Sequence, residues 1–349
     1  MAPAQTVTLP ELLESPAWFP LEVSQGAVQL LQLDEAAYRT ASFLDQRLRT
    51  QGYREASCPL ELVRRAGSSL PPRAYYVFHT GHVGSTLISR LLGAHESFFS
   101  LREPALLRTL AAGAEPGAAP GSASTLDLRS ALGLFSRSWR CHQRPLIKLT
   151  SIVSELTEVI LGADEHPKAI LMFTDPATYL RGILAGPNSR IETRMQAPAR
   201  RRRLLRRLAG AWWSEPRSEG EQIAMTWLCE MLALHQGATR FADRVAWVHF
   251  DAFLQDPASG LRTLFHALGA ELPCAEIQAI VAGPLMRQYS KAPEHAYDAA
   301  LRRAVLLSAD REHPVELRRG MQWLQAAGGR SPLVAAVLTF AADPAVGRR

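Results

Sequence analysis

One short stretch constrains the fold more than any other, because it joins a buried strand to a helix through a glycine-containing loop. Residues 75–78 (Tyr-Tyr-Val-Phe) are aromatic or β-branched and follow two prolines, which predicts a short buried strand. A tight loop comes next, and Ser85 and Thr86 can cap the helix that follows it. Apolar side chains at 87, 88, 91 and 92 then fall on one helical face.

A strand, a glycine loop and a helix N-terminus together form an anion site, since free backbone N–H groups converge there and the helix dipole favours negative charge. The sequence therefore predicts that this loop binds a phosphate or sulfate group, in preference to serving as a plain strand-to-helix turn. The predicted cradle is Thr80, Gly81, His82, Val83, Gly84, Ser85 and Thr86.

The loop differs from a nucleotide-triphosphatase loop at two positions. In the Gly-x-x-x-x-Gly-Lys-Ser/Thr register, His79 replaces the first glycine and Ser85 replaces the lysine, whereas Gly84 and Thr86 fit. Without the lysine a nucleoside triphosphate loses its main β/γ-phosphate contact. An ordinary ATPase or GTPase and a kinase-like phosphoryl transferase are therefore disfavoured.

With these residues and several later motifs, the chain resembles the sulfotransferase superfamily over roughly residues 73–300. The family's loops commonly read Arg/Lys-Ser-Gly-Ser/Thr-Thr, and the family's Arg-Glu-Pro, Arg-Asp-Pro and Tyr-Glu-Asp-Leu…Asp-Pro elements have counterparts here in the same order. The matching segments are 82–86, 101–104, 173–176, 227 and 249–257. Each motif is weak alone, and their order makes the combination moderately specific.

The resemblance implies a three-layer α/β P-loop fold with a parallel sheet. It also implies sulfuryl transfer from 3′-phosphoadenosine 5′-phosphosulfate (PAPS) to a hydroxyl or amine, with no metal expected. In the family, a strand-end arginine and a serine eight positions later hold the 3′-phosphate of the donor. Here those positions carry Thr174 and Gly182, and Arg181 or Arg190 could substitute for them. A nucleotide- or anion-binding protein that has lost catalysis is therefore a second hypothesis.

Sulfuryl transfer needs a held donor, a stabilised bridging oxygen and a base for the acceptor proton. His82 could donate to the bridging oxygen or a phosphate, with protonation supplying the charge that a lysine normally carries, or it could be a solvent-facing loop residue. Glu103 is the predicted base, the alternative being a surface pair with Arg102. Lys148 could contact the leaving group or acceptor, although its strand-end position favours a side chain that reaches solvent.

Three further apolar runs, 145–149, 168–173 and 244–250, predict parallel core strands, with helices at 151–161, 177–185 and 221–242 between them. Asp175, followed by Pro176, is expected to cap a helix rather than to act as a Walker B carboxylate.

We expect a small N-terminal α/β extension over 1–70, with strands in 17–33 and a helix from Asp34 to about Leu48 that turns Phe43 and Leu44 inward. The P-loop domain then covers 71–300, and a helical C-terminal tail packed on it covers 301–349. Residues 113–124 read as a mobile connection, and 289–291 could belong to a lid over the nucleotide.

Composition excludes several other classes of protein. The formal charge of +6 comes almost entirely from arginine, since the chain has three lysines, and this bias can reflect genome base composition. The four scattered cysteines and the absence of a Cys/His cluster predict reduced thiols and no zinc site. With no signal-like N-terminus and no membrane-length apolar run in the sequence, we expect a cytoplasmic protein. Homo-oligomerisation stays open.

The densest charge run is Arg200–Arg203 with Arg206 and Arg207, interleaved with leucines. It could bind an acidic substrate, nucleic acid or anionic lipid, but a solvated helix near the acceptor site is the favoured interpretation. Nucleic acid is therefore not an expected partner. The identity of the acceptor depends on loops such as 186–220 and stays open.

Overall fold

The computed structural model describes residues 7–113, 126–163, 166–208, 213–292, 294–343 and 346. The connection predicted at 113–124 lies almost wholly outside these residues. Within them, no helix combines the length and apolar character needed to cross a bilayer.

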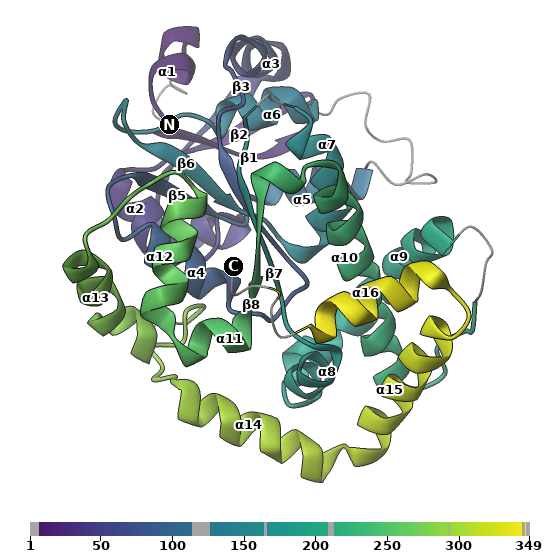
Figure 1. Cartoon of the computed structure of the whole chain (residues 1–349). Helices are drawn as coiled ribbons and strands as arrows, with labels where there is room; N and C mark the ends of the chain where they lie inside the picture. Colours follow the sequence, from purple (N-terminus) through teal and green to yellow (C-terminus); the bar gives the residue numbers. More distant parts are fainter. Residues whose placement is uncertain are drawn as a thin grey trace.

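The centre of the molecule is a five-stranded, all-parallel sheet in the order β5-β6-β4-β7-β8 (Figure 1). The four predicted core strands are confirmed. A fifth strand, β5, was not predicted, because polar Ser100 and Arg102 interrupt its short apolar run. The strands are β4 (Tyr75–His79), β5 (Phe98–Arg102), β6 (Arg144–Lys148), β7 (Ala169–Phe173) and β8 (Val245–His249).

Helices cover both faces of this sheet, which confirms the predicted three-layer α/β architecture. Alternate residues of β4 point to opposite faces, so Tyr76 and Phe78 join one buried cluster and Val77 joins the other. The first cluster includes side chains of α5 (Ala105–Gly113), α7 (Thr157–Leu161) and α10 (Glu219–Arg240). The second includes side chains of α4 (Ser85–Leu92) and α12 (Pro257–Ala267).

The N-terminal part forms a separate three-stranded antiparallel sheet of β1 (Trp18–Ser24), β2 (Ala27–Gln32) and β3 (Arg54–Pro59). Helices α1 (Leu9–Glu14) and α3 (Leu60–Ser69) accompany it. The helix predicted from Asp34 to about Leu48 is wrong in its length: α2 (Glu35–Thr40) ends early, and a 3-10 turn, η1 (Gln46–Gln51), follows. Asp45 caps that turn by accepting from the Arg47 N–H, so the chain restarts there. Leu44 is fully buried, as predicted, and Phe43 only partly.

The remaining helices and 3-10 turns connect the strands of the parallel sheet. These are α6 (Leu128–Leu134), η2 (Ser151–Leu156), α8 (Pro176–Leu184), α9 (Pro187–Leu208) and η3 (Ala242–Arg244). Asp175 accepts a hydrogen bond from the Thr178 N–H at 2.9 Å, which confirms it as the N-cap of α8.

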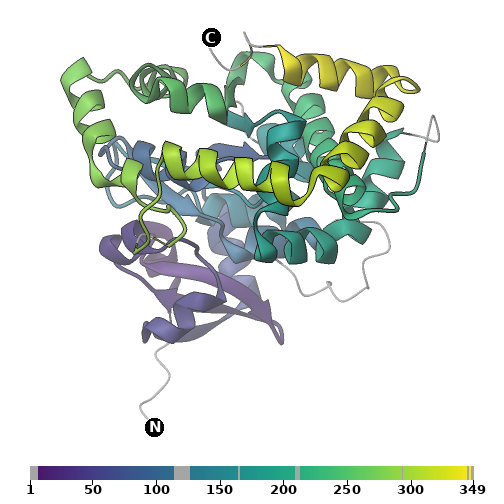
Figure 2. The same cartoon turned by 90° about the horizontal axis from the view of Figure 1, so that it is seen from below.

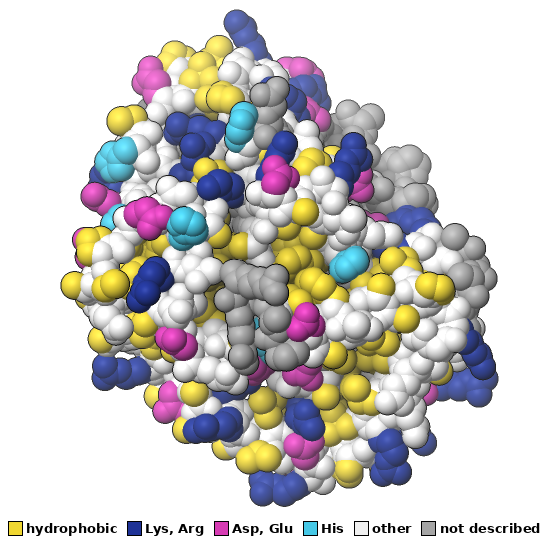
Figure 3. All heavy atoms as spheres, in the orientation of Figure 1, with side chains coloured by type: hydrophobic (Ala, Val, Ile, Leu, Met, Phe, Trp, Pro, Cys, Tyr) yellow, Lys and Arg dark blue, Asp and Glu magenta, His cyan; other side chains and the backbone are white. Residues whose placement is uncertain are grey.

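The part after β8 is helical, as predicted. Helix α14 runs across the molecule between the α11–α13 region and α15, and it packs against α8 (Figure 2). On the face seen in Figure 3, Lys and Arg side chains are interspersed with Asp and Glu rather than gathered into one patch. The elements are α11 (Phe250–Gln255), α13 (Cys274–Ala282), η4 (Pro284–Arg287), α14 (Ala299–Glu312), α15 (Pro314–Gly328) and α16 (Pro332–Ala342).

Candidate functional site

The carboxyl ends of the parallel strands carry the polar residues of the site. His79 ends β4, Lys148 ends β6, Glu103 follows β5 and Thr174 follows β7. Arg102 and Lys148 are register partners, and the Glu103 N–H donates to the Lys148 carbonyl at 2.6 Å. Ligands bind in crevices at this edge of open α/β sheets, so the fold brings these side chains to a favourable place.

The loop between β4 and α4 adopts left-handed backbone conformations at three positions. Gly81, His82 and Gly84 have φ of 95°, 54° and 67°. Gly84 is the N-cap of α4 and its helix begins at Ser85, so the expected capping by Ser85 and Thr86 is wrong. A left-handed conformation at the non-glycine His82 is strained, and such strain is concentrated at functional sites.

His79 holds this loop through both ring nitrogens. Its Nε2–H donates to the Leu149 carbonyl at 2.7 Å, and its Nδ1 accepts from the Gly81 N–H at 3.0 Å. Burial, together with the nearby Lys148 ammonium, holds the pKa of His79 well below its usual range. The imidazole is therefore neutral, with the proton on Nε2, and it fixes the start of the loop.

A large cavity of about 750 Å³ opens beside the loop. The loop, α8, α11 and residues of the segments 286–291 and 295–306 line it, and these include 289–291, the residues that could belong to a lid. Thr86 lies on its wall and is buried, and its Oγ1 has no hydrogen-bond partner within the described residues. A buried hydroxyl without a partner costs free energy unless a ligand satisfies it. The volume is in the range of pockets that hold a nucleotide-sized molecule.

A second, polar cavity of about 280 Å³ adjoins the first, and His79, His82, Tyr179 and Lys291 line both. Glu103 lies on the wall of this second cavity. The loop thus stands at the junction of two compartments, which is the arrangement that a transfer between two bound molecules requires.

Lys148 and Glu103 form a largely buried ion pair at the wall of the second cavity, which Glu103 lines. The Lys148 ammonium donates to Oε1 of Glu103, and the lysine side chain is only 1% exposed. The expectation that Lys148 reaches solvent is therefore wrong, because Glu103 supplies a partner at the end of the neighbouring strand. Burial lowers the pKa of Lys148, and the Glu103 carboxylate opposes that shift. Glu103 itself has a left-handed backbone, with φ of 52°.

The surroundings of His82 favour the neutral ring in the ligand-free protein, whereas one of the two interpretations from the sequence calls for a protonated ring. Burial, followed by the charges of Lys291, Arg200 and Lys148, lowers its pKa to about 3. Its Nδ1 lies 3.3 Å from the Ser189 hydroxyl, and its Nε2 lies 3.9 Å from the Glu192 carboxylate. These cations make the junction electrostatically positive, which favours an anion there.

The residues proposed for the 3′-phosphate of the donor are already engaged. Thr174 donates its hydroxyl to Asp251, Arg181 donates to Asp310 at 2.7 Å, and Arg190 donates to Glu219. The cations that line the large cavity are instead Lys291 and Arg302, and Arg302 also pairs with Asp251 at 2.5 Å. Sequence reasoning missed Arg302, since a helix more than a hundred residues after the loop brings it there.

The arginine run on α9 is not a solvated face throughout. Arg200 is 3% exposed and donates to the Glu230 carboxylate at 2.8 Å and to Ser151 at 3.1 Å. Arg203 is fully buried and donates to the Ile152 carbonyl. The favoured interpretation is wrong at these two positions, because α10 and η2 supply polar partners for the inward side of the helix.

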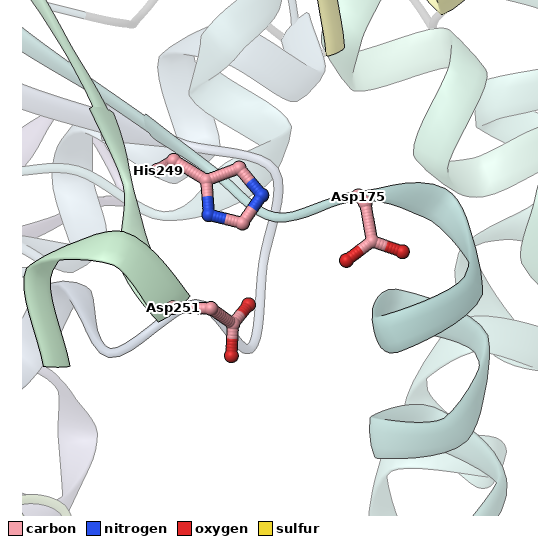
Figure 4. A group of neighbouring side chains, drawn as sticks. All are labelled: Asp175, His249 and Asp251. Carbon is pink, nitrogen blue, oxygen red and sulfur yellow. The ribbon is translucent and has the colours of Figure 1, made fainter. Parts of the chain in front are cut away.

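Asp175, His249 and Asp251 approach one another at the ends of β7 and β8 (Figure 4), with ligand-type atoms within 4.8 Å of one another. Each of them already has a structural task. Asp175 caps α8, Asp251 binds Thr174 and Arg302, and Nδ1 of His249 accepts from the Ala252 N–H. A cation here would compete with the Arg302 guanidinium, so the cluster reads as a hydrogen-bonded network.

The fold and the loop define an α/β protein with a left-handed glycine loop at the carboxyl edge of a parallel sheet. No protein-family model matches the chain, and no curated protein matches it. Among solved structures it is similar to the sulfotransferase domain from the curacin biosynthetic pathway, with 16% identity, a TM-score of 0.41, and coverage of 73% of this chain and 98% of that one. It is also similar to a sulfotransferase from Alicyclobacillus acidocaldarius, with 12% identity, a TM-score of 0.41, and coverage of 76% and 95%.

Proposed function

We propose that the protein transfers a sulfuryl group from PAPS to a hydroxyl or amine acceptor. The observation that carries the proposal is the meeting of two cavities at one anion loop, with a buried Glu103–Lys148 pair on the acceptor side. The motifs at 82–86, 101–104 and 173–176 agree with this assignment.

On the donor side, the backbone N–H groups from Gly81 to Thr86 and the unpartnered Thr86 hydroxyl would bind the phosphosulfate oxygens. Lys291 would add a positive charge at the junction, where the loop itself has no lysine. Neutral His82 would donate a hydrogen bond to the bridging oxygen from a ring N–H.

On the acceptor side, the Glu103 carboxylate would accept the proton of the acceptor hydroxyl or amine as the new O–S or N–S bond forms. The bond from sulfur to the bridging phosphate oxygen breaks in the same step, and its electrons stay with the phosphate. Lys148 would hold Glu103 in place through Oε1, which leaves Oε2 for the acceptor.

An anion-binding protein without catalysis is the second candidate, because Thr174, Arg181 and Arg190 are all engaged with acidic side chains. Calorimetry with adenosine 3′,5′-bisphosphate, adenosine 5′-phosphosulfate and ATP with magnesium separates these possibilities. Tight binding of the bisphosphate supports the proposal. Binding of ATP but not of the bisphosphate overturns it, and binding of none of the three favours the second candidate.

Glu103→Gln provides the test of the base. We expect donor binding to stay intact and turnover to fall by roughly a hundredfold or more, because the amide cannot accept the proton. Turnover is measured as release of adenosine 3′,5′-bisphosphate from PAPS with a panel of hydroxyl and amine acceptors. Glu215→Gln, at an exposed ion pair with Arg201, is the matched control. Unchanged turnover in Glu103→Gln would refute its role.

A further inference from the structure

A third cavity, of about 260 Å³, lies apart from the two at the anion loop and shares no lining residue with them. It is enclosed by α2, the C-terminal end of α4, β5 and Leu285 of η4. Four large side chains with apolar surfaces line it, and three of them are aromatic: Tyr38, Phe98, Phe99 and Leu285.

Two guanidinium groups face this space with no carboxylate partner among the described residues. Arg102 is 2% exposed and donates to three carbonyls near the end of α2 and to the Ser100 hydroxyl. Arg90 donates through Nη2 to the Thr40 carbonyl and the Ser42 hydroxyl, whereas its buried Nε has no acceptor in the described part of the chain. Burial, then the charge of Arg90, lowers the pKa of Arg102 to about 9, so its positive charge is poorly compensated.

Glu35, the acidic residue on the cavity wall, does not neutralise these charges. Its carboxylate accepts from Arg39 at 3.2 Å and from Arg140 at 2.9 and 3.0 Å, so it is already shared between two other arginines. The residues on the wall and their immediate partners therefore bring four positive charges and one negative charge to the cavity. The positive charges are those of Arg39, Arg90, Arg102 and Arg140, and the negative charge is that of Glu35.

Gln143 adds an independent sign of a missing ligand. Its side chain is 4% exposed and lies on the cavity wall, and its Oε1 has no hydrogen-bond partner within the described residues. A buried amide oxygen left without a donor costs on the order of 1–3 kcal/mol. An occupant that carries a hydroxyl or amine donor next to its anionic group would remove that cost.

Arg137 shows what a purely structural buried arginine looks like in the same molecule. Its guanidinium donates to four backbone carbonyls, of Leu12, Ser15, Trp18 and Leu134, and it lines none of the three cavities. Carbonyl partners alone therefore do not define a site. Three features distinguish Arg90 and Arg102 from Arg137. They line a cavity, they lie close to each other as two cations, and Nε of Arg90 and Oε1 of Gln143 beside them have no hydrogen-bond partner in the described residues.

We propose that this third cavity binds a small organic oxyanion, a carboxylate or phosphate monoester on an aromatic or aliphatic body. The anionic group would accept from Nε and Nη1 of Arg90 and from Nη1 of Arg102, and the body would pack on Phe98, Phe99 and Leu285. Leu285 directly precedes Met286, and Met286 lines the large cavity beside the loop. An occupant of the third cavity would therefore contact the start of the segment that borders the large cavity.

Calorimetry on the full chain with phenyl phosphate, benzoate and inorganic phosphate tests this proposal. We expect phenyl phosphate and benzoate to bind more tightly than inorganic phosphate, because the latter lacks an apolar body. Arg90→Gln should weaken both by at least tenfold, and Gln143→Leu should weaken a hydroxybenzoate more than benzoate. Inorganic phosphate binding as tightly as both would contradict the predicted apolar contact.

Thr86→Val, in the anion loop, is the matched control, because phenyl phosphate could also enter that site. The proposal predicts that benzoate binding survives Thr86→Val and is lost in Arg90→Gln. Loss in Thr86→Val with retention in Arg90→Gln would assign the binding to the loop and overturn the proposal. Absence of binding by all three probes would overturn it as well.

Discussion

Arg200 and Glu230 lie almost completely out of water, with side chains 4% and 1% exposed, and they are joined by a 2.8 Å hydrogen bond. Burial raises the pKa of Glu230, and the Arg200 charge opposes that shift. Lys148 and Glu103 repeat this arrangement at the strand ends. At the scale of single residues, the site is therefore built from charges that are tolerable only as pairs.

Arg200→Met should destabilise the fold by about 3–5 kcal/mol, because it leaves the Glu230 carboxylate buried without its cation. Chemical unfolding measures this effect. The neighbouring Arg201→Met, which removes an exposed pair with Glu215, should cost no more than about 1 kcal/mol. A double replacement, Arg200→Met with Glu230→Met, should recover much of the loss. Equal effects of the two single variants would contradict the buried-pair interpretation.

Buried His79 and partly buried His82 give stability a defined pH dependence. The pKa values of His79 and His82 are lowered in the folded state, so below pH 6.5 the unfolded chain binds protons that the folded chain does not. The contribution of the neutral histidines to the free energy of unfolding is therefore fully present only above about pH 6.5, and it decreases as the pH falls below that value. Between pH 7.5 and 5.5 the free energy of unfolding should therefore decrease, and His79→Gln should reduce the slope of that decrease. Urea unfolding at several pH values measures it, and an unchanged slope in the variant would contradict the role of His79.

At the scale of elements, the β4–loop–α4 unit depends on close packing by α11. A Cβ on Gly84 would lie 2.1 Å from the Phe250 ring, and the residue has a φ of 67°. The glycine therefore meets both a steric and a conformational requirement. Phe250 is the first residue of α11 and directly follows β8, so the end of one strand shapes the loop that follows another.

Gly84→Ala should destabilise the fold by about 2 kcal/mol or more and weaken anion binding, because either the ring or the loop must move. Gly182→Ala is the matched control: that glycine lies in helix α8 with open space around its Cβ, and alanine there should stabilise by up to about 1 kcal/mol. Thermal unfolding and calorimetry with inorganic sulfate measure the two effects. If Gly84→Ala lost anion binding without any loss of stability, the glycine would be needed for the conformation of the loop and not for the packing against Phe250.

At the scale of the whole molecule, the N-terminal sheet and the parallel sheet share one hydrophobic core. The ring of Phe19 contacts those of Tyr38 and Phe135, and Tyr38 contacts Phe99 on β5. Arg137 adds hydrogen bonds to carbonyls of the N-terminal segment. The N-terminal part therefore behaves as a layer of the same folded unit.

Arg137→Met should loosen this attachment, since three carbonyls of the N-terminal segment lose a buried charged donor. We expect a loss of at least about 2 kcal/mol of stability and faster hydrogen exchange over residues 9–24. Arg140→Met, which removes an exposed pair with Glu35, should leave exchange in that segment unchanged. Equal protection in wild type and Arg137→Met would show that the aromatic contacts alone hold the two sheets together.

The parallel strands and the anion loop were predictable because their signals are local. Tyr75–His79 reads as a strand from its own composition, and the glycines mark the loop beside it. Strand β5 and the broken helix after Asp34 were not predictable, because tertiary contacts override a weak or interrupted pattern. Asp175 was recognised as a cap, since the capping residue and Pro176 are adjacent in sequence.

By itself, the sequence determined the strand–loop–helix unit, the α/β layering and the place of the candidate anion loop, since each depends on residues close together in the chain. Only the tertiary structure decided which charges are buried, which are paired and which face a cavity. Lys148 and Arg200 look solvent-bound in sequence, and Arg302 looks unrelated to the loop. Their partners and neighbours come from distant segments, and the cost of burying a charge depends on those partners rather than on the charge itself.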